Sequence, residues 1–366
     1  MDSLAKATYF FTGFPGFLAT RIIDKLIENG SDSDFELLVH PSAMEQAKIR
    51  TKRLAGNGRK IGRIRIHEGD ITKADLGLAS AVSGELNETV THVFHLAAVY
   101  DLAVPEALAQ AVNVTGTRNV NAWVLHCRKI ERYVYFSTAY VSGTRKGTIL
   151  ETELACGQGF KNHYERTKYD AEVLVHYVRD RVPTTIIRPG IVLGDSRTGE
   201  TEKFDGPYFI MRFLDKFSGM PIPYIGKSRA AINLVPVDYI IDATHHLSRS
   251  SAGIDKVYHL TDPSPYMARD AFRLIAEELA GKKPVFTVPR SSVYMMLSMP
   301  SFRRWVQVER ETLDYFHLEA EFDCSGAAAD LSQAGIRCPD FADYIPKAVE
   351  FYKENRHDPR KLIEVK

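Results

Sequence analysis

The feature that most constrains the fold is a glycine-spaced turn near the start of the chain. An apolar run at residues 8–11 precedes the turn and predicts a strand, and apolar residues at helical spacing from 18 to 27 predict a helix after it. Gly13 and Gly16 let the backbone turn at positive φ and let a phosphate approach it, while the helix N-terminus offers unpaired N–H groups. In this T-G-x-x-G-x-x-A spacing Ala19 takes the third glycine position of the dinucleotide fingerprint, which serves helix–strand packing. For the turn alone, an ordinary strand–helix connection remains the alternative.

Apolar strands alternate with helical stretches through the first half of the chain. Helices are expected at 44–55, from about 104 and from 164 to about 180, and the expected strands are 8–11, 35–39, 64–67, 93–98, 133–136 and 184–190. Near-continuous apolar strands in such an alternation favour a parallel sheet covered on both faces. We therefore predict an α/β chain with a Rossmann-type doubly wound parallel sheet.

Beyond Gly194 the alternation loosens, and Gly, Pro and Ser become frequent. This change predicts a dinucleotide-binding domain made of residues 1–194 plus 229–261. A smaller, discontinuous substrate lobe would then comprise residues 195–228 plus 262–366.

Composition excludes several functional classes. The formal net charge of +1 over 366 residues gives no reason to expect nucleic acid or an anionic membrane as partner. No apolar run approaches the roughly 20 residues of a membrane span, and no hydrophobic signal segment precedes the first strand, so we expect a cytoplasmic protein. The 4 cysteines show no C-x-x-C spacing, which favours reduced thiols over disulfides or a metal site.

Tyr164 and Lys168 are four residues apart, which places them on one face of a helix. An ammonium beside a phenol lowers the tyrosine pKa from about 10, so Tyr164 is a candidate general acid for a carbonyl that receives hydride. Thr138 ends a strand at the sheet edge where ligands bind, and its hydroxyl can reach the same substrate oxygen. Thr138 could instead cap a helix or turn. Tyr164 and Lys168 could instead be a solvent-facing pair, because about one accidental Y-x-x-x-K is expected in a chain with 17 tyrosines. The ordered set argues against accident: the glycine turn, Asp70, Asn113, Thr138, Tyr164 with Lys168, then Arg188-Pro189-Gly190.

Cofactor choice is expected to depend on the end of the second strand. No acid stands there to bind the ribose 2′-hydroxyl of NAD; His40 and Ser42 occupy the turn, and basic residues follow between 48 and 53. We therefore favour NADP(H), with NAD(H) as the alternative. Those bases could equally form a solvated helix face.

From about Ala7 to beyond Asp238 the chain resembles the extended short-chain dehydrogenase/reductase family, and within it the branch of thioester reductases and fatty acyl-CoA reductases of the male-sterility type. The residues that carry the resemblance are 12–19, 95–98, Asn113 with 116–117, 137–143, 159–168 and 233–238. The resemblance implies that Tyr164 protonates the carbonyl oxygen, Thr138 hydrogen-bonds it, and Lys168 tunes Tyr164 and holds the nicotinamide ribose. Ala19 departs from the family pattern, as does His40, which stands where NADP-preferring relatives tend to carry arginine.

The expected site can be stated in full. Its catalytic residues are Thr138, Tyr164, Lys168 and Asn113. The resemblance implies that Asp70 and Ile71 contact adenine, that Leu96, Ala97 and Ala98 line the nucleotide cleft, and that Pro189, Gly190 and Val192 bracket the nicotinamide. The other expected cofactor-binding residues are Thr12, Gly13, Phe14, Pro15, Gly16, Phe17, Leu18, His40 and Ser42, and no metal site is expected.

The function predicted from these residues is NADP(H)-dependent hydride transfer to the carbonyl of a small molecule, an acyl thioester or an aldehyde. A nucleotide-sugar epimerase or dehydratase that retains NAD, and a non-catalytic dinucleotide sensor, are the alternatives. A homodimer is compatible with the sequence. The methionine-rich stretch 294–305 is expected to pack in a core, with a lid over an acyl chain as the alternative.

Overall fold

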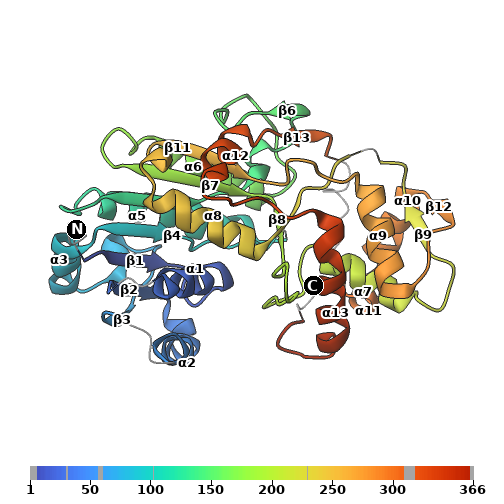
Figure 1. Cartoon of the computed structure of the whole chain (residues 1–366), viewed down its shortest axis with the longest axis horizontal. Coiled ribbons are helices and arrows are strands. Elements are labelled where there is room, and N and C mark those ends of the chain that lie inside the picture. The colour runs from blue at the N-terminus through green and yellow to red at the C-terminus, as the bar shows by residue number, and fades with distance from the viewer. Residues whose placement is uncertain are drawn as a thin grey trace.

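A parallel sheet of seven strands forms the larger part of the molecule (Figure 1). The computed structural model describes residues 6–29, 32–56, 61–101, 103–228, 230–308 and 318–362. The strand order is β11-β7-β5-β4-β1-β2-β3. Their bounds are β1 Thr8–Thr12, β2 Asp34–Val39, β3 Ile64–Glu68, β4 His92–His95, β5 Arg132–Phe136, β7 Thr184–Pro189 and β11 Lys256–Leu260. The predicted doubly wound sheet is confirmed.

Helices cover both faces of this sheet, each over its own apolar core. One face carries α1 (Phe17–Glu28), α2 (Met44–Ala55), α8 (Val237–Arg249) and α12 (Ser325–Ser332). The other carries α3 (Ser80–Thr89), α5 (Gly116–Val124) and α6 (His163–His176). A short α4 (Glu106–Ala109) runs into α5 through a π-helical turn at Gln110–Thr115. Because both faces are covered, strands such as β1, β2, β5 and β7 are buried along their whole length.

Two elements differ from the sequence expectation near the site. β11 is a seventh strand beside β7, and β4 ends at His95 instead of continuing to residue 98. The end of β4 has a steric cause, because its neighbour β1 ends at Thr12 and the chain then turns across the tip of β4 at Gly13. A Cβ on Gly13 would lie only 2.7 Å from the Ala97 nitrogen. Residues 96–98 are thereby left outside the sheet, at its carboxyl edge.

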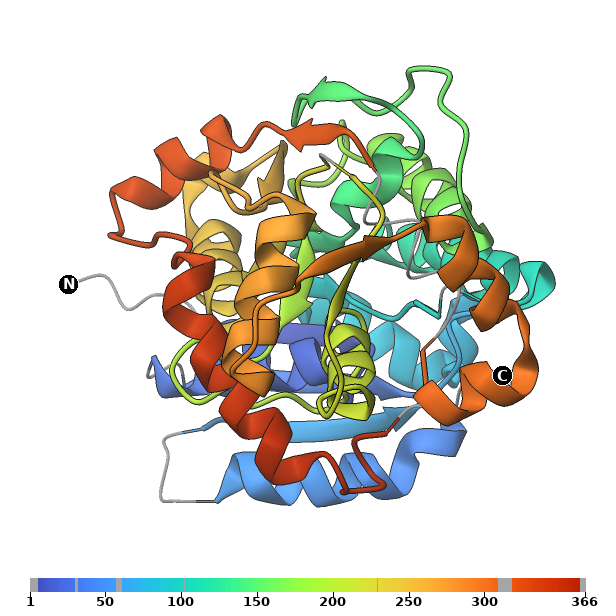
Figure 2. The ribbon, with the colours of Figure 1, turned by 90° about the vertical axis from the view of Figure 1, so that its right-hand side faces the viewer.

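A second, mainly helical part lies beyond the carboxyl edge and faces the viewer in Figure 2. It contains α7 (Tyr208–Lys216), α9 (Ala268–Ala280), α10 (Arg290–Ser298), α11 (Pro300–Val306) and α13 (Phe341–Asn355), with β9 (Pro223–Ile225) paired to β12 (Phe286–Val288). Its main core is formed by α7, α9 and α13. A pair of short parallel strands, β8 (Ile191–Leu193) and β10 (Leu234–Pro236), connects it to the sheet.

One segment assigned by sequence to the substrate lobe packs on the main body instead. β13 (Ala320–Phe322) pairs with β6 (Gly147–Ile149), at the top of Figure 1, and α12 follows it. Ala327 and Leu331 of α12 belong to the core over the main sheet. The assignment of residues 262–366 to the lobe is therefore too broad at 320–332, since apolar spacing alone does not say which core a helix joins. The rest of the domain division stays a prediction.

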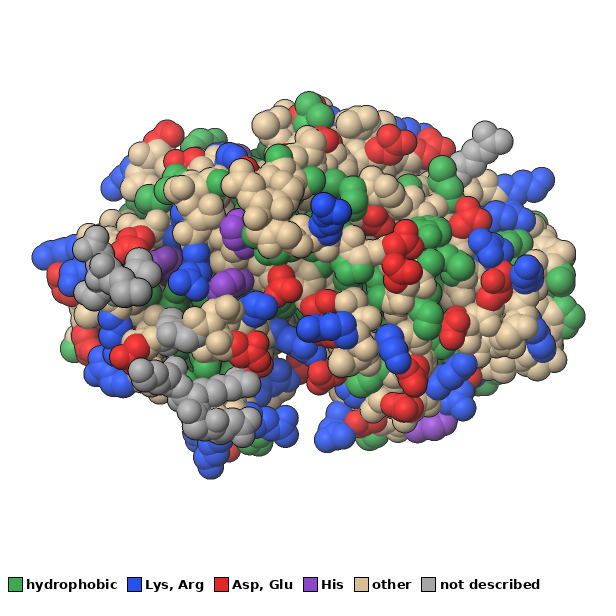
Figure 3. Space-filling view, viewed as in Figure 1, with side chains coloured by type: hydrophobic (Ala, Val, Ile, Leu, Met, Phe, Trp, Pro, Cys, Tyr) green, Lys and Arg blue, Asp and Glu red, His purple; other side chains and the backbone are tan. Residues whose placement is uncertain are grey.

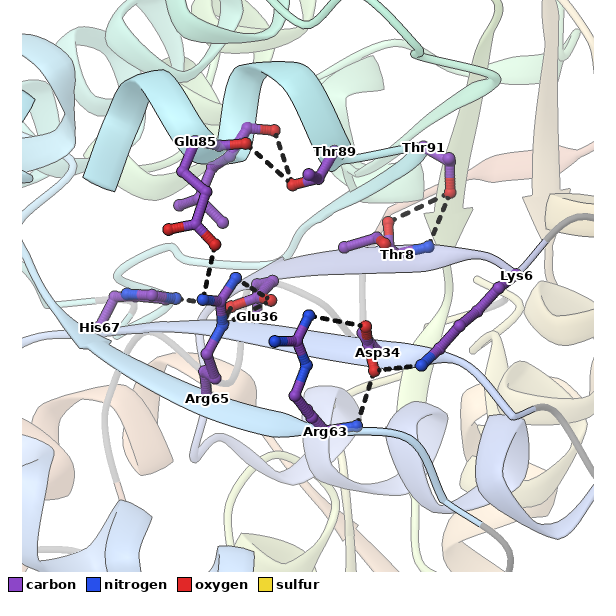
Figure 4. A network of polar contacts seen from close by, with 11 residues as sticks. Lys6, Thr8, Asp34, Glu36, Arg63, Arg65, His67, Glu85, Thr89 and Thr91 are labelled. Atoms are coloured by element: carbon purple, nitrogen blue, oxygen red, sulfur yellow. Dashed lines mark hydrogen bonds and ion pairs between the residues drawn. The ribbon is translucent and has the colours of Figure 1, made fainter. Parts of the chain in front are cut away.

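A buried carboxylate holds the outer strands together (Figure 4). Glu36 of β2 is 1% exposed and accepts bonds at 2.9 Å from the Arg65 Nε, and its Oε2 lies 2.6 Å from the His67 Nε2, both on β3. Arg65 also donates to Glu85 of α3 at 2.7 Å. A buried charge requires such partners, so this cluster fixes the β2–β3 register.

The surface carries both signs of charge interspersed, as Figure 3 shows for one face. This distribution agrees with the small net charge of the chain. Within the described ranges, no helix has both the length and the apolar character needed to cross a membrane.

Candidate active site

The turn between β1 and α1 forms a cradle in which Gly13 is half-buried and Gly16 is exposed. Gly13 has φ +85°, and the closeness of Ala97 leaves no room for a side chain there. Gly16 is the N-cap of α1; no side chain caps this helix and its first turn holds no acid. The helix therefore presents free N–H groups and a partial positive charge at its start, which suits a pyrophosphate. Ala19 is 1% exposed and packs into the core, as expected for the third position of the fingerprint.

A buried polar chain runs behind this cradle. The Thr12 hydroxyl accepts from the Ala97 N–H at 3.2 Å and lies 2.7 Å from the His95 Nδ1. The other ring nitrogen, Nε2, lies 3.0 Å from the Thr117 hydroxyl of α5. Burial, with a smaller effect from Lys168, lowers the pKa of His95 to about 3, so the ring is neutral. The Thr12 side chain is therefore held by His95 and the Ala97 backbone, directly beside the cradle.

The ends of β2 and β3 form the next part of the cleft. His40 and Ser42 are exposed, with the His40 Nδ1 2.8 Å from the Ser42 Oγ. Asp70 accepts from the Thr72 N–H at 2.9 Å; burial alone would raise the pKa of Asp70, but Thr72 and the charge of His40 hold it below its usual value. Ile71 is buried against Gly116, so its side chain packs inward.

Two of the basic residues downstream of β2, Lys48 and Arg50, have acidic partners. Lys48 pairs with Glu45 on its own helix at 2.7 Å. Arg50 pairs with Glu202, in the segment leading to α7. These two side chains therefore stabilise α2 and its contact with Glu202, while His40 stands at the turn itself.

Thr138 and Tyr164 meet at the carboxyl edge of the sheet. Thr138 lies two residues beyond the end of β5 and is 6% exposed. Tyr164 stands in the first turn of α6, which Asn162 caps by accepting from the Glu165 N–H at 2.9 Å. The two hydroxyls are hydrogen-bonded to each other. Burial raises the pKa of Tyr164 to about 12, against the lowering effect of Thr138. The expected shift of the Tyr164 pKa toward neutrality is therefore not found.

Lys168 is buried one turn further along α6, with 4% of its surface exposed. Its Nζ donates to the Tyr135 hydroxyl at 3.0 Å and to the Phe136 carbonyl oxygen at 2.6 Å, both on β5. Burial lowers the pKa of Lys168 to about 7, and the Glu172 carboxylate opposes this shift. The sequence identified the lysine but not Tyr135, because nothing in the local pattern links a strand tyrosine to a helix 33 residues away.

Asn113 lies in the π-helical turn and is 1% exposed. Its amide accepts from the Val99 N–H at 2.8 Å and donates to the Val99 carbonyl and the Thr167 hydroxyl at 3.0 Å each. Because Thr167 precedes Lys168, these bonds tie Asn113 and the segment after β4 to α6. π-Helical turns of this kind recur at functional sites.

The remaining predicted residues also lie at this edge. Leu96, Ala97 and Ala98 are partly exposed beyond β4. Pro189 ends β7, and Gly190 and Val192 follow it; a Cβ on Gly190 would lie 2.8 Å from the Asn233 backbone oxygen. The predicted set therefore converges on one side of the sheet, with the turn residues Phe14 and Pro15 buried and Phe17 and Leu18 at the start of α1.

A buried ion pair that the sequence did not reveal lies behind Thr138 in the candidate site. Glu172 of α6 and Arg188 of β7 are 0% and 1% exposed, and Arg188 Nε donates to both carboxylate oxygens at 3.0 and 3.2 Å. Ser137, next to Thr138, donates to the same carboxylate. Burial would raise the pKa of Glu172, but Arg188, His176 and Ser137 lower it to about 2.

An apolar cavity lies in the second part of the molecule. It contains about 720 Å³ of empty space including its open mouth, and Arg269 stacks on Tyr224 at its wall, 3.7 Å from the ring centre. Val293 and Leu297 of α10 line it, whereas Met295, Met299 and Trp305 are 67, 48 and 50% exposed. Core packing is therefore wrong for those three side chains. The other lining residues come from α7, β9 and the loop after it, α9, and Val308.

This fold, with a glycine cradle beside a Tyr-x-x-x-Lys helix and a threonine at the strand end, defines the extended short-chain dehydrogenases/reductases, a class of NAD(P)-dependent oxidoreductases. A family profile described as male sterility protein matches residues 11–244. The chain belongs to the male sterility protein family.

Known proteins of several kinds are similar to this chain in sequence. L-2-aminoadipate reductase of Saccharomyces cerevisiae is 28% identical over 63% of this chain and 18% of its own length. The non-canonical nonribosomal peptide synthetase cpsA of Aspergillus campestris is 26% identical over 79% of this chain and 29% of its own. The putative fatty acyl-CoA reductase CG8303 of Drosophila melanogaster is 23% identical over 66% and 52%. The chain thus spans about half or less of these relatives.

Solved structures share the fold. The terminal R domain of the myxalamid biosynthetic pathway superposes with a TM-score of 0.81 at 23% identity, over 98% of this chain and 93% of that one. UDP-glucuronic acid 4-epimerase of Bacillus cereus, in complex with NAD, gives 0.65 at 16% identity, over 95 and 99%. Both the R domain and the epimerase are below 25% identity, so this similarity shows the fold alone.

Proposed function

We propose that this chain reduces the carbonyl of an acyl thioester or aldehyde with hydride from NADP(H). The hydrogen-bonded pair of Tyr164 and Thr138 hydroxyls, beside a backbone cradle suited to a dinucleotide, is the observation that carries the proposal. The names of the similar aminoadipate and fatty acyl-CoA reductases support an acyl substrate.

In this reaction the nicotinamide cofactor supplies the hydride when it is bound. Tyr164 and Thr138 hold the carbonyl oxygen between their hydroxyls, and Tyr164 delivers the proton as charge develops there. Lys168, when protonated, stabilises the phenolate that remains. The Glu172–Arg188 pair ties α6 to β7, and the bond from Ser137 to Glu172 ties α6 to the segment that follows β5. These contacts, with the bonds of Asn113 to Val99 and Thr167, keep Tyr164 and Thr138 together.

A thioester would be reduced to a hemithioacetal, which expels the thiol and leaves an aldehyde. The apolar cavity supports an acyl group with an apolar chain, because such a chain gains about 0.8 kcal/mol for each buried methylene. The length of the similar peptide synthetase supports a further proposal, that the acyl group arrives tethered to another protein or domain.

The preference for NADP(H) is supported by His40. No carboxylate stands at the end of β2 to repel a 2′-phosphate, and His40 and Ser42 are exposed there. Replacing His40 by Asp should therefore move the ratio of kcat/KM for NADPH and NADH toward NADH by at least tenfold. An unchanged ratio would refute this role.

The decisive experiment follows NADPH absorbance with acyl-CoAs, aldehydes and ketones, for the wild type and Tyr164→Phe. Loss of a general acid should lower kcat about 10²- to 10⁴-fold. Tyr169→Phe on the same helix, where the ring contacts Phe160, is the matched control and should retain wild-type turnover. Equal turnover in wild type and Tyr164→Phe would contradict the proposed acid. Oxidised cofactor that accumulates with product separates reduction from epimerase or dehydratase chemistry, which returns the cofactor to its starting state.

A further inference from the structure

The catalytic lysine is one end of a polar chain that crosses the core of the sheet. Its Nζ donates to the Tyr135 hydroxyl at 3.0 Å, and that hydroxyl is hydrogen-bonded to Thr117. Thr117 lies 3.0 Å from the His95 Nε2, and the opposite ring nitrogen lies 2.7 Å from the Thr12 hydroxyl. The chain therefore leads from α6 through β5, α5 and β4 to the residue before Gly13.

An ammonium has three N–H donors and no acceptor, which sets the direction of this chain. Because Lys168 donates to the Tyr135 oxygen, the Tyr135 hydroxyl can donate to Thr117. The Thr117 hydroxyl can then donate to Nε2 of His95, and the Nδ1–H of His95 can donate to the Thr12 hydroxyl. Every member is 0–4% exposed, so bulk solvent does not reach these groups. The neutral state of His95 leaves Nε2 as the acceptor that this direction requires.

We propose that Tyr135 is a positioning residue that keeps Lys168 protonated and aimed at the cofactor side of the cleft, with Thr117 and His95 orienting its hydroxyl. The expected effect of Tyr135 on turnover rests on the proposed function. The expected effect of Tyr135 on the protonation of Lys168 does not, because it requires neither substrate nor cofactor.

Electrostatic surroundings explain why one neutral hydroxyl matters. Around Lys168 the titratable and charged groups are Glu172 and Tyr164 on α6, Tyr135 on β5 and His95 on β4, with Arg188 of β7 engaged by Glu172. Burial disfavours the charged form of Lys168, and the Glu172 carboxylate, which favours it, is also paired with Arg188. Besides the Phe136 carbonyl, the Tyr135 oxygen is the acceptor that Lys168 uses among the described residues.

Tyr135→Phe isolates this hydroxyl, because the ring that lies 4.5 Å from Nζ remains. A hydrogen bond to a charged group corresponds to a pKa change of about one to two units. The control is Tyr133→Phe on the same strand, which is equally buried but donates to Asn121 at 2.9 Å, away from Lys168.

The direct test titrates lysine labelled with ¹³Cε and ¹⁵Nζ in the cofactor-free protein by NMR, with Lys168→Met to assign the signal. We expect Tyr135→Phe to lower the pKa of Lys168 by about one to two units and Tyr133→Phe to leave it unchanged. Thr117→Val, which removes the partner of Tyr135, should give a smaller shift in the same direction, and it decides the question if Tyr135→Phe does not fold. A wild-type pKa in Tyr135→Phe, or an equal shift in Tyr133→Phe, would overturn the proposal.

The kinetic arm measures kcat against pH. In Tyr135→Phe the alkaline limb should move down by the same amount as the NMR titration, because the lysine loses its proton earlier. A limb that stays in place while the NMR pKa shifts would refute the kinetic part alone. A protein that shows no reductase turnover would refute the proposed function and leave the NMR result to decide the role of Tyr135.

Discussion

The buried pair of Glu172 and Arg188 permits a quantitative prediction. The pKa of Glu172 is about 2 against an ordinary 4.5, which at 1.36 kcal/mol per unit corresponds to about 3 kcal/mol of stability at neutral pH. Arg188→Met removes the cation and leaves a carboxylate buried without it. Breaking a buried pair in this way costs about 3–5 kcal/mol.

The sign of the pH dependence makes this prediction specific. In the wild type the depressed pKa of Glu172 stabilises the fold above pH 4.5, and that stabilisation is lost as the pH falls toward 2. In Arg188→Met the unpaired carboxyl favours its neutral form, so its contribution weakens as the pH rises. The difference in unfolding free energy between the two proteins should therefore grow from about pH 3 to pH 7.

Urea unfolding followed by circular dichroism measures this difference, with Arg132→Met as the control. Arg132 is 4% exposed but donates to Thr185 and main-chain oxygens, so its loss should show no comparable growth with pH. Adding Glu172→Gln to Arg188→Met should recover at least about 1 kcal/mol. A cost below about 1 kcal/mol at pH 7, or a double variant no more stable than the single one, would refute the reasoning.

Three further predictions concern the cradle, a buried acid and the cavity. Gly13 has φ +85°, and a Cβ there would lie 2.7 Å from backbone, so Gly13→Ala should lower stability by about 1–3 kcal/mol and weaken NADPH binding in a fluorescence titration. The control is Gly147→Ala, at φ +73° in open space, which should leave NADPH binding unchanged. Equal NADPH binding by the two variants would contradict the proposed cradle. Burial raises the pKa of Glu151 to about 7, so this residue should stabilise the fold below pH 4.5 and lose about 3 kcal/mol of that stabilisation by pH 7. Glu151→Gln should therefore flatten the dependence of the unfolding free energy on pH, measured by urea unfolding. An unchanged pH dependence would disprove this. Leu297→Gln should raise KM for long acyl substrates more than for short ones, and equal changes would remove the cavity from the substrate path.

The sequence predicted best what short segments determine. The turn around Gly13 could be predicted because backbone freedom, helix start and apolar spacing are all local, and the parallel sheet followed from the alternation of buried strands. Tyr164 and Lys168 could be placed together because a helix brings residues four apart onto one face.

The partners of these residues could not be predicted, because they depend on how distant elements pack. Tyr133 and Tyr135 look alike in the strand, and only the position of α6 decides which of them meets the lysine. The same holds for α12, whose apolar face would fit either core, and for Met295 and Trp305, which are apolar but exposed. The pKa of Tyr164 was misjudged because the spacing to Lys168 shows proximity but not burial.

The chain passes repeatedly between the core around the sheet and the core of α7, α9 and α13. It crosses along β8, returns along β10, leaves again after β11, comes back at β13 and departs once more before α13. Two parts joined by several chain segments differ from two domains joined by a single flexible linker. Any wide separation of the halves would have to bend all these connections at once, so we expect substrates to enter by adjustment of rim loops such as residues 226–228 while the halves stay joined.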